Sequence, residues 1–133
     1  MPAASYDILV EQGIDYPFKL RLANRAVPVD WTGFTARFAV ATSRGADAVP
    51  LFALEAPGDI TFSSPEGWIN IPISATLSRS LPSFEQFRLR ESRLVRGRRF
   101  YQFGFFDLNL TDQEGASWRP LSGGFYVAPE VIA

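Results

Sequence analysis

The hydrophobic pattern of this chain alternates between apolar and polar residues. Two segments show it most clearly, with apolar positions first at Tyr16, Phe18, Leu20 and Leu22 and then at Phe34, Ala36, Phe38 and Val40. Successive side chains of a β-strand point to opposite faces of the sheet, so this spacing predicts two strands that each bury one face. Residues 30–33 before the second strand have the polar and glycine content of a turn.

Shorter segments with the same pattern extend the prediction along the chain. We expect further strands over residues 6–11, 51–54, 60–62, 69–73, 100–110, 118–121 and 123–127. Residues 12–15 predict a tight connection that joins the first strand to the second as a β-hairpin. Pro72 cannot donate a backbone hydrogen bond, so we expect its strand to lie at a sheet edge or to end there.

Residues 74–81 have helical spacing instead. Ser74 is a favourable N-cap residue, and Leu77 and Leu81 are four residues apart, which predicts a short helix or helical turn. The 133 residues therefore predict a single all-β domain over residues 1–133, a two-sheet antiparallel β-sandwich of seven to nine strands with one short helical turn. The 12 phenylalanines suit the large inward side chains that such a sandwich needs.

The predicted strand over residues 100–110 changes the face on which its apolar side chains lie. These side chains form two groups on opposite faces, Tyr101, Phe103 and Phe105 in the first half and Phe106, Leu108 and Leu110 in the second. Either a bulge near Gly104 turns the first group toward the core, or the first group forms an outward aromatic row. An exposed row marks a protein contact, whereas a row that the arm over residues 84–99 covers is part of the core.

Positive charge is concentrated in an arm or flap at about residues 82–99. Its arginines are Arg88, Arg90, Arg93, Arg96, Arg98 and Arg99. The stretch is either a hairpin that turns at residues 96–98 or an extended flap. A solvated or partner-facing arm is favoured over a nucleic-acid site, because the acidic remainder of the chain repels a polyanion. We expect these arginines, together with Tyr101, Phe103 and Phe105, to form a protein interface.

The composition removes several kinds of chemistry. The chain has no His and no Cys, which excludes a Ser-His-Asp triad, a thiolate nucleophile, a disulfide and a His- or Cys-ligated metal. Its 13 basic and 14 acidic residues give a net charge of -1, which argues against a dedicated nucleic-acid binder. The N-terminus has no signal-peptide pattern, and no apolar stretch approaches the ~20 residues of a membrane helix.

Acidic side chains near the end of the chain are the remaining candidates for chemistry. Asp107, Asp112 and Glu114 are compatible with a calcium site or a carboxylate pair. Turn formation explains them better, because Asp112 favours turn geometry and Gly115 supplies positive φ. A glycosidase also needs two carboxylates beside a cleft. We therefore predict no catalytic residue, no metal and no cofactor, and a protein that is not an enzyme.

The three tryptophans have two interpretations. Trp31, Trp68 and Trp118 either fill the ends of the sandwich and cap turns, or form a platform on which a sugar ring stacks. Trp68 is the best exposed candidate for glycan binding, because it alternates with isoleucines that point inward.

Several short motifs, taken in order, resemble the immunoglobulin-like domain at the start of bacteriophage baseplate upper proteins and related tail-fibre-associated proteins. These motifs are Gly13-Ile14-Asp15-Tyr16, Val29-Asp30-Trp31-Thr32-Gly33 leading to Ala36-Arg37-Phe38, Ile71-Pro72-Ile73-Ser74-Ala75-Thr76-Leu77, Phe106-Asp107-Leu108-Asn109-Leu110-Thr111-Asp112 with Gly115, and Leu121-Ser122-Gly123-Gly124. The resemblance spans most of the chain. It implies a non-enzymatic immunoglobulin-like sandwich that attaches to a tail, baseplate or fibre by one surface.

The resemblance also sets the expected function, partners and location. We expect a virion structural component, made in the host cytoplasm, that contacts other virion proteins and copies of itself in a symmetric assembly. Nucleic acid and membrane are not expected partners. The alternative is a carbohydrate- or host-receptor-binding module. The arginine-rich stretch is longer than the short link expected at this position, and we expect this protein to meet its own partner there.

Overall fold

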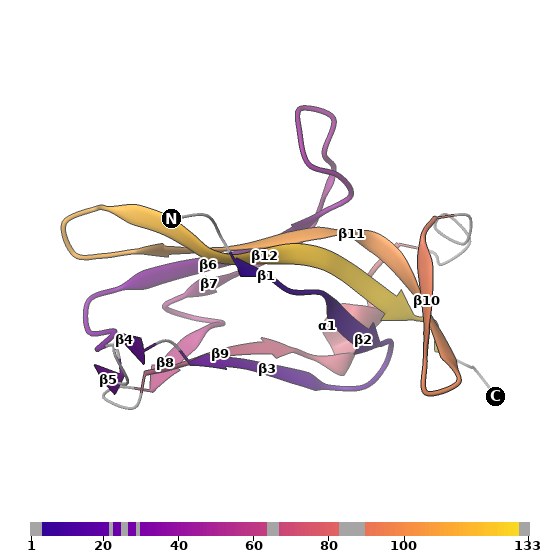
Figure 1. The fold of residues 1–133 in the computed structure, drawn as a ribbon, viewed down its shortest axis with the longest axis horizontal. Helices are drawn as coiled ribbons and strands as arrows, with labels where there is room; N and C mark the ends of the chain where they lie inside the picture. Colours follow the sequence, from indigo (N-terminus) through magenta and orange to yellow (C-terminus); the bar gives the residue numbers. More distant parts are fainter. Residues whose placement is uncertain are drawn as a thin grey trace.

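The fold is described from a computed structural model that covers residues 4–21, 23–24, 27–28, 30–63, 67–82 and 90–130. Within these residues the chain forms two packed layers of β-strands and one short helix (Figure 1). The prediction of an all-β, sandwich-like architecture with one helical turn is therefore confirmed. Twelve strand segments are described, and three of them have only two residues.

The larger sheet combines strands from both ends of the chain with strands from its middle. They are β1 (Ala4–Ser5), β2 (Ile8–Glu11), β6 (Thr35–Ala41), β7 (Pro50–Ala56), β10 (Ser92–Val95), β11 (Arg98–Thr111) and β12 (Ser117–Ala128). The strand order is β1-β12-β11-β6-β7, with β2 also paired to β12 and β10 to β11. The long antiparallel pair of β11 and β12 runs along most of the molecule (Figure 1).

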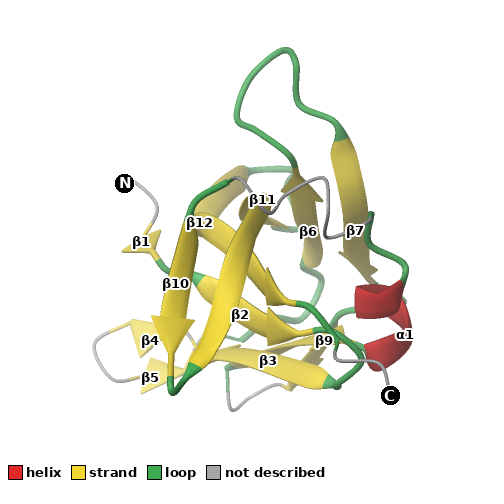
Figure 2. Ribbon diagram, turned by 90° about the vertical axis from the view of Figure 1, so that its right-hand side faces the viewer, coloured by secondary structure: helices red, strands yellow, loops and turns green. Residues whose placement is uncertain are grey.

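The smaller sheet lies across from this layer. Its strands are β3 (Tyr16–Arg21), β9 (Trp68–Ile73) and β8 (Thr61–Ser63), which are antiparallel and lie in the order β3-β9-β8. The short strands β4 (Ala23–Asn24) and β5 (Val27–Pro28) pair only with each other. The helix α1 (Ala75–Arg79) follows β9 at one end of the smaller sheet (Figure 2).

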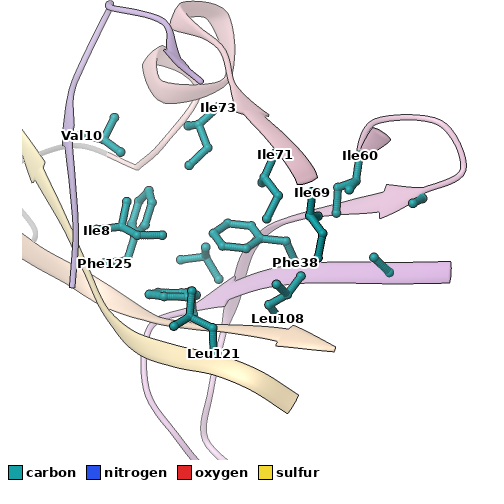
Figure 3. Packing of buried hydrophobic residues seen from close by; sticks show 14 of the residues in the cluster. Ile8, Val10, Phe38, Ile60, Ile69, Ile71, Ile73, Leu108, Leu121 and Phe125 are labelled. Carbon is teal, nitrogen blue, oxygen red and sulfur yellow. The ribbon is translucent and has the colours of Figure 1, made fainter. Parts of the chain in front are cut away.

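The hydrophobic core lies between the two sheets (Figure 3). Side chains that point inward from the larger sheet include Ile8, Val10, Phe38, Leu108, Leu121 and Phe125, and those across from them include Ile60, Ile69, Ile71 and Ile73. Each fully buried aliphatic or Phe side chain stabilises the fold by about 1.5–3 kcal/mol relative to an exposed one. The core is thus the main source of stability for the whole sandwich.

The predicted alternation is confirmed in the strands that build this core. In β6, Ala36, Phe38 and Val40 are buried, and in β9 every second residue is a buried isoleucine. The apolar residues of β3 are half-buried and its intervening residues are exposed. Leu22, which continued the pattern, lies outside the described residues.

The predicted hairpin between the first two strands is wrong. The backbone turns at residues 12–15, where the Ile14 N–H donates to the Glu11 carbonyl oxygen at 3.1 Å. However, β2 pairs in parallel with β12 in the larger sheet, whereas β3 pairs with β9 in the smaller one. The turn therefore carries the chain from one layer to the other. A period-2 pattern reports which face of a strand is buried and leaves its partner strand undetermined.

Of the two alternatives predicted for Pro72, the edge position is wrong, whereas the strand does end there to within one residue, because β9 ends at Ile73. β9 is the central strand of the smaller sheet, and Pro72 lies opposite Pro17 of β3. On its other side β9 pairs with β8 only through residues 68–70. Pro72 lies beyond that pairing, so the missing N–H leaves the β8 ladder intact.

The short helix begins as the sequence predicts. Ser74 is the N-cap, and its Oγ accepts a hydrogen bond from the Leu77 N–H at 3.0 Å. The helix has five residues. No helix within the described ranges has the length and apolar character needed to cross a membrane.

Candidate protein interface at the β10–β11 hairpin

The arginine-rich stretch contains a β-hairpin, as one of the two sequence interpretations predicts. β10 and β11 are antiparallel, with Arg93 opposite Phe100 and Val95 opposite Arg98. Arg96 and Gly97 form the turn and have φ values of 51° and 79°. Positive φ at both central residues is the requirement of a type I′ turn, which asparagine followed by glycine satisfies best. We refer to residues 92–101 as the arginine hairpin.

Arg93 attaches the arginine hairpin to the rest of the larger sheet. Its guanidinium forms an ion pair with Asp7 and lies over the Tyr126 ring, 4.8 Å from the ring centroid. The other carboxylate oxygen of Asp7 accepts a hydrogen bond from the Gly124 N–H at 3.0 Å. Burial raises the pKa of Tyr126 above its ordinary value, against the opposing effect of the Arg93 charge.

Arg98 makes a second attachment. Its Nε lies 3.2 Å from Oε1 of Glu11, and its Nη2 donates a hydrogen bond to the Pro129 carbonyl oxygen at 2.7 Å. Arg93 and Arg98 therefore each form an ion pair with a carboxylate of the same chain, although the buried Nε of Arg98 makes no hydrogen bond. Their side chains hold the hairpin in place, and they are weaker candidates for contacting a partner than the sequence suggested.

The other arginines of the stretch have different surroundings. Arg99 donates to the Ser92 hydroxyl at 2.9 Å, and Arg90 donates to the Thr42 carbonyl oxygen at 3.1 Å. Arg96 is exposed at the turn, and within the described part of the chain it has no hydrogen-bond or ion-pair partner. Arg88 and the rest of residues 83–89 lie outside the described residues.

A hollow of about 490 Å³ lies beside the arginine hairpin. We call it the hairpin hollow; its lining residues are Leu9, Glu11, Ile14, Asp15, Tyr16, Val95, Arg96, Arg98 and Phe100. Part of its wall belongs to a small hydrophobic cluster in which Leu9 and Val95 pack against Phe100. Ile14 is 58% exposed, although it is a large aliphatic residue.

The aromatic group in the first half of β11 does not form an outward row. The register of β11 against β12 shifts between Gln102 and Gly104, as a bulge requires. Phe103 is only 1% exposed and belongs to the main core, and Tyr101 is half-buried against that core. Of the two sequence interpretations, the bulge is confirmed, and an exposed contact through Phe103 is ruled out.

Phe105 lies on the other side of this bulge. It is half-buried, and the Arg44 guanidinium covers its ring at 4.7 Å from the centroid. Gly104 is required beside it because a Cβ at this position would overlap the Ala41 carbonyl oxygen. The close approach of β6 to β11 thus fixes the bulge position, and no local sequence pattern reports such an approach.

The three tryptophans lie in different surroundings. Trp31 is buried, and its ring stacks against Phe62 and Trp118 with centroid separations of 5.7 and 6.5 Å. Trp68 is 38% exposed with Arg21 near its ring, and Trp118 is 43% exposed. The sequence singled out Trp68, whereas Trp118 is the more exposed of the two and has an aromatic support.

Two of the three acidic candidates, Asp112 and Asp107, serve a turn and an ion pair. Asp112 Oδ1 accepts hydrogen bonds from the N–H groups of Glu114 and Ala116, which shapes the turn between β11 and β12. Asp107 lies 3.5 Å from the Nε of Arg119. Among the described residues, no group of three or more acidic side chains is placed to hold a metal ion.

Comparison with known proteins adds no assignment. No family model matches the chain, and no curated protein matches it. Two features of the candidate interface have no signal in the sequence: the pairing of Asp7 and Glu11 with arginines far along the chain, and the position of Ile14 beside them.

Proposed function

We propose that this chain is a virion structural component of a bacteriophage tail, baseplate or fibre-attachment region. It acts through protein-protein contacts in a symmetric assembly, in which each copy presents the same surface to its neighbours. It performs no catalysis in this role. The ordered motifs that resemble the baseplate domain support the proposal, and the arrangement of the strands is compatible with it.

The strand order supports an immunoglobulin-like classification within this proposal. In immunoglobulin sandwiches one sheet contains strands B, E and D and the other contains strands G, F and C, extended by C′ in variable-type domains. The orders β3-β9-β8 and β12-β11-β6-β7 correspond to these two sheets, with the strands in the same succession along the chain. Because an immunoglobulin-like sandwich serves many functions, this agreement bears on the fold alone.

The exposed end of the arginine hairpin is the observation that carries the proposal. Arg96 has no partner within the described chain. Ile14, which lines the same hollow, is 58% exposed, and Leu94, two residues before Arg96 in the chain, is 63% exposed. Arginine combined with exposed apolar side chains is typical of protein interfaces. Attachment to the sheet through Arg93 and Arg98 holds this surface in a defined position before a partner binds, which lowers the ordering cost of association.

The experiment that tests this function is an analysis of purified phage particles from cells that produce the chain. We expect quantitative mass spectrometry to find it at a fixed copy number, and immunogold electron microscopy to locate it at the tail, baseplate or fibre attachment. Its absence from particles, or a copy number that varies between preparations, would contradict the proposal.

A carbohydrate- or host-receptor-binding role is the second candidate. The exposed Trp118 ring, supported from behind by Trp31, favours it, because a rigid aromatic face suits stacking against a sugar ring. Binding on a glycan array that is lost in Trp118→Ala or Trp68→Ala would favour this role over the structural one. Equal binding by both variants and the unchanged chain would remove it.

A further inference from the structure

We infer that the hairpin hollow is the docking site for a segment of a neighbouring virion protein, one that carries a large apolar side chain next to a carboxylate. This inference rests on the proposed structural function and names the chemistry of its partner. The hollow lies between the arginine hairpin and the turn that follows β2, so two separate parts of the chain line it.

The apolar part of the partner follows from the wall of the hollow. Leu9, Val95 and Phe100 supply carbon surface there, and Ile14 extends that surface toward solvent. A volume of about 490 Å³ leaves room for one large side chain. An apolar side chain placed in the hollow removes this surface from water, which favours association.

The acidic part follows from the charges at the rim. Glu11 is paired with Arg98, and Asp15 accepts a hydrogen bond from the Ala75 N–H at 2.7 Å. Arg96 is the lining residue whose positive charge has no acidic partner in the described part of the chain. A carboxylate on the incoming segment completes this pairing and fixes the direction in which the segment lies.

The backbone at Arg96 gives independent support. Its φ of 51° lies in the left-handed region, which residues other than glycine and asparagine rarely adopt. Asparagine at this turn position would relieve the strain, yet the chain has arginine. A strained residue whose charge is unpaired at a surface is typical of a binding position.

A polypeptide is favoured over a nucleic acid as the occupant. Glu11 and Asp15 line the same hollow, so a polyanion that reached Arg96 would also meet two carboxylates. The net charge of -1 adds to this repulsion. A single carboxylate beside an apolar side chain meets much less of this repulsion than a polyanion does.

Photo-crosslinking in assembled particles tests the inference. We replace Ile14 by the photoreactive residue p-benzoylphenylalanine in the full chain, purify particles, irradiate them and sequence the crosslinked peptides by mass spectrometry. We expect one partner segment in which an Asp or Glu lies next to a large apolar residue. Val49 is the matched control position, because it is also 58% exposed but does not line the hollow; it should not capture this segment.

Two hairpin variants test the role of the charge. Arg96→Asn removes the charge and suits the positive φ, so we expect a two- to five-fold lower crosslink yield from position 14 with the hairpin intact. Arg99→Asn removes a charge that does not line the hollow and should leave the yield unchanged.

Three results would overturn the inference. The first is a chain that incorporates into particles but gives no crosslink from position 14. The second is capture of nucleic acid or of a segment without an acidic residue. The third is an equal effect of the Arg96 and Arg99 variants. If the unchanged chain is absent from particles, the proposed function itself is contradicted, and so is the inference that rests on it.

Discussion

The sandwich core and the arginine hairpin use different interactions to hold their shape. In the core, Phe38, Leu108 and Ile71 are fully buried between two sheets (Figure 3). The hairpin extends the larger sheet at one end (Figure 1). Two of its arginines form ion pairs with the carboxylates of Asp7 and Glu11. A buried side chain contributes about 1.5–3 kcal/mol, whereas an exposed ion pair contributes about 0–1 kcal/mol. Stability thus resides in the core, and the hairpin is free to present polar groups.

Truncation of a side chain in the core should lower the stability of the fold far more than truncation of one in the arginine hairpin. We expect Phe38→Ala to lower the free energy of unfolding by about 3–5 kcal/mol, because it removes buried contacts and leaves a cavity. Leu94→Ala, at a residue that is 63% exposed, should change it by less than about 0.5 kcal/mol. Urea denaturation followed by tryptophan fluorescence measures both values. Similar losses of unfolding free energy in the two variants would contradict the claim that stability resides in the core.

A methyl group at the bulge should have the next largest effect. We expect Gly104→Ala to lower the free energy of unfolding by about 2–4 kcal/mol, because the added Cβ overlaps the Ala41 carbonyl oxygen and pushes β6 from β11. Gly115→Ala is the control: it has positive φ but no atom within 4 Å of the added Cβ, so about 1–2 kcal/mol is expected from backbone strain alone. A smaller loss at Gly104 than at Gly115 would show that the approach of the strands is not tight.

Loss of the Asp7 charge should weaken the attachment of the hairpin. We expect Asp7→Asn to cost about 1 kcal/mol, because the amide oxygen still accepts from Gly124 while the ion pair to Arg93 is lost. A double-mutant cycle with Arg93→Gln should give a coupling of similar size that decreases at high salt. A coupling near zero would mean that the hairpin is held by the Tyr126 contact instead.

Alkaline titration tests the edge of the core near β3. Burial, with a smaller contribution from Tyr6, raises the pKa of Tyr16 to about 12 from its ordinary value of 10.0. Between pH 10 and 12 the unfolded chain releases this proton while the folded chain keeps it, so folding stability should fall as pH rises through that window. Since Tyr16 is half exposed, we expect about 1 kcal/mol, discounted for solvent screening. Tyr16→Phe should remove this part of the decrease, and an unchanged alkaline profile would contradict the assignment.

The smallest effect is a gain in stability at the turn. Arg96→Asn places a residue that tolerates positive φ before Gly97, so we expect the free energy of unfolding to rise by about 0.5–1 kcal/mol. Thermal unfolding by circular dichroism measures it. The same variant should incorporate less well into particles, and a variant that is less stable would show that Arg96 has a structural role in the fold.

Local features of the molecule could be predicted from the sequence. The inward faces of β6 and β9, the N-cap at Ser74 and the turn at Asp112 follow from periodicity and from residue preferences over a few positions. The arginine hairpin was one of two interpretations, and its turn at residues 96–98 was located correctly.

Features that depend on distant parts of the chain could not be predicted. The parallel pairing of β2 with β12 has no local signal, because alternation is the same for any partner strand. The pairing of Arg93 with Asp7 and of Arg98 with Glu11 follows from that arrangement. The sequence therefore assigned all the arginines of the stretch to one surface, whereas the fold gives two of them internal partners.

Accessibility of position 14 in the free chain and in the particle is the most direct test of the contact surface. The chain has no cysteine, so a single Ile14→Cys variant reacts with maleimide at one site only. We predict at least ten-fold slower labelling in assembled particles than in the free chain, with the fold of the free variant verified by circular dichroism. Equal labelling rates in the two states would contradict the assignment of this surface to assembly.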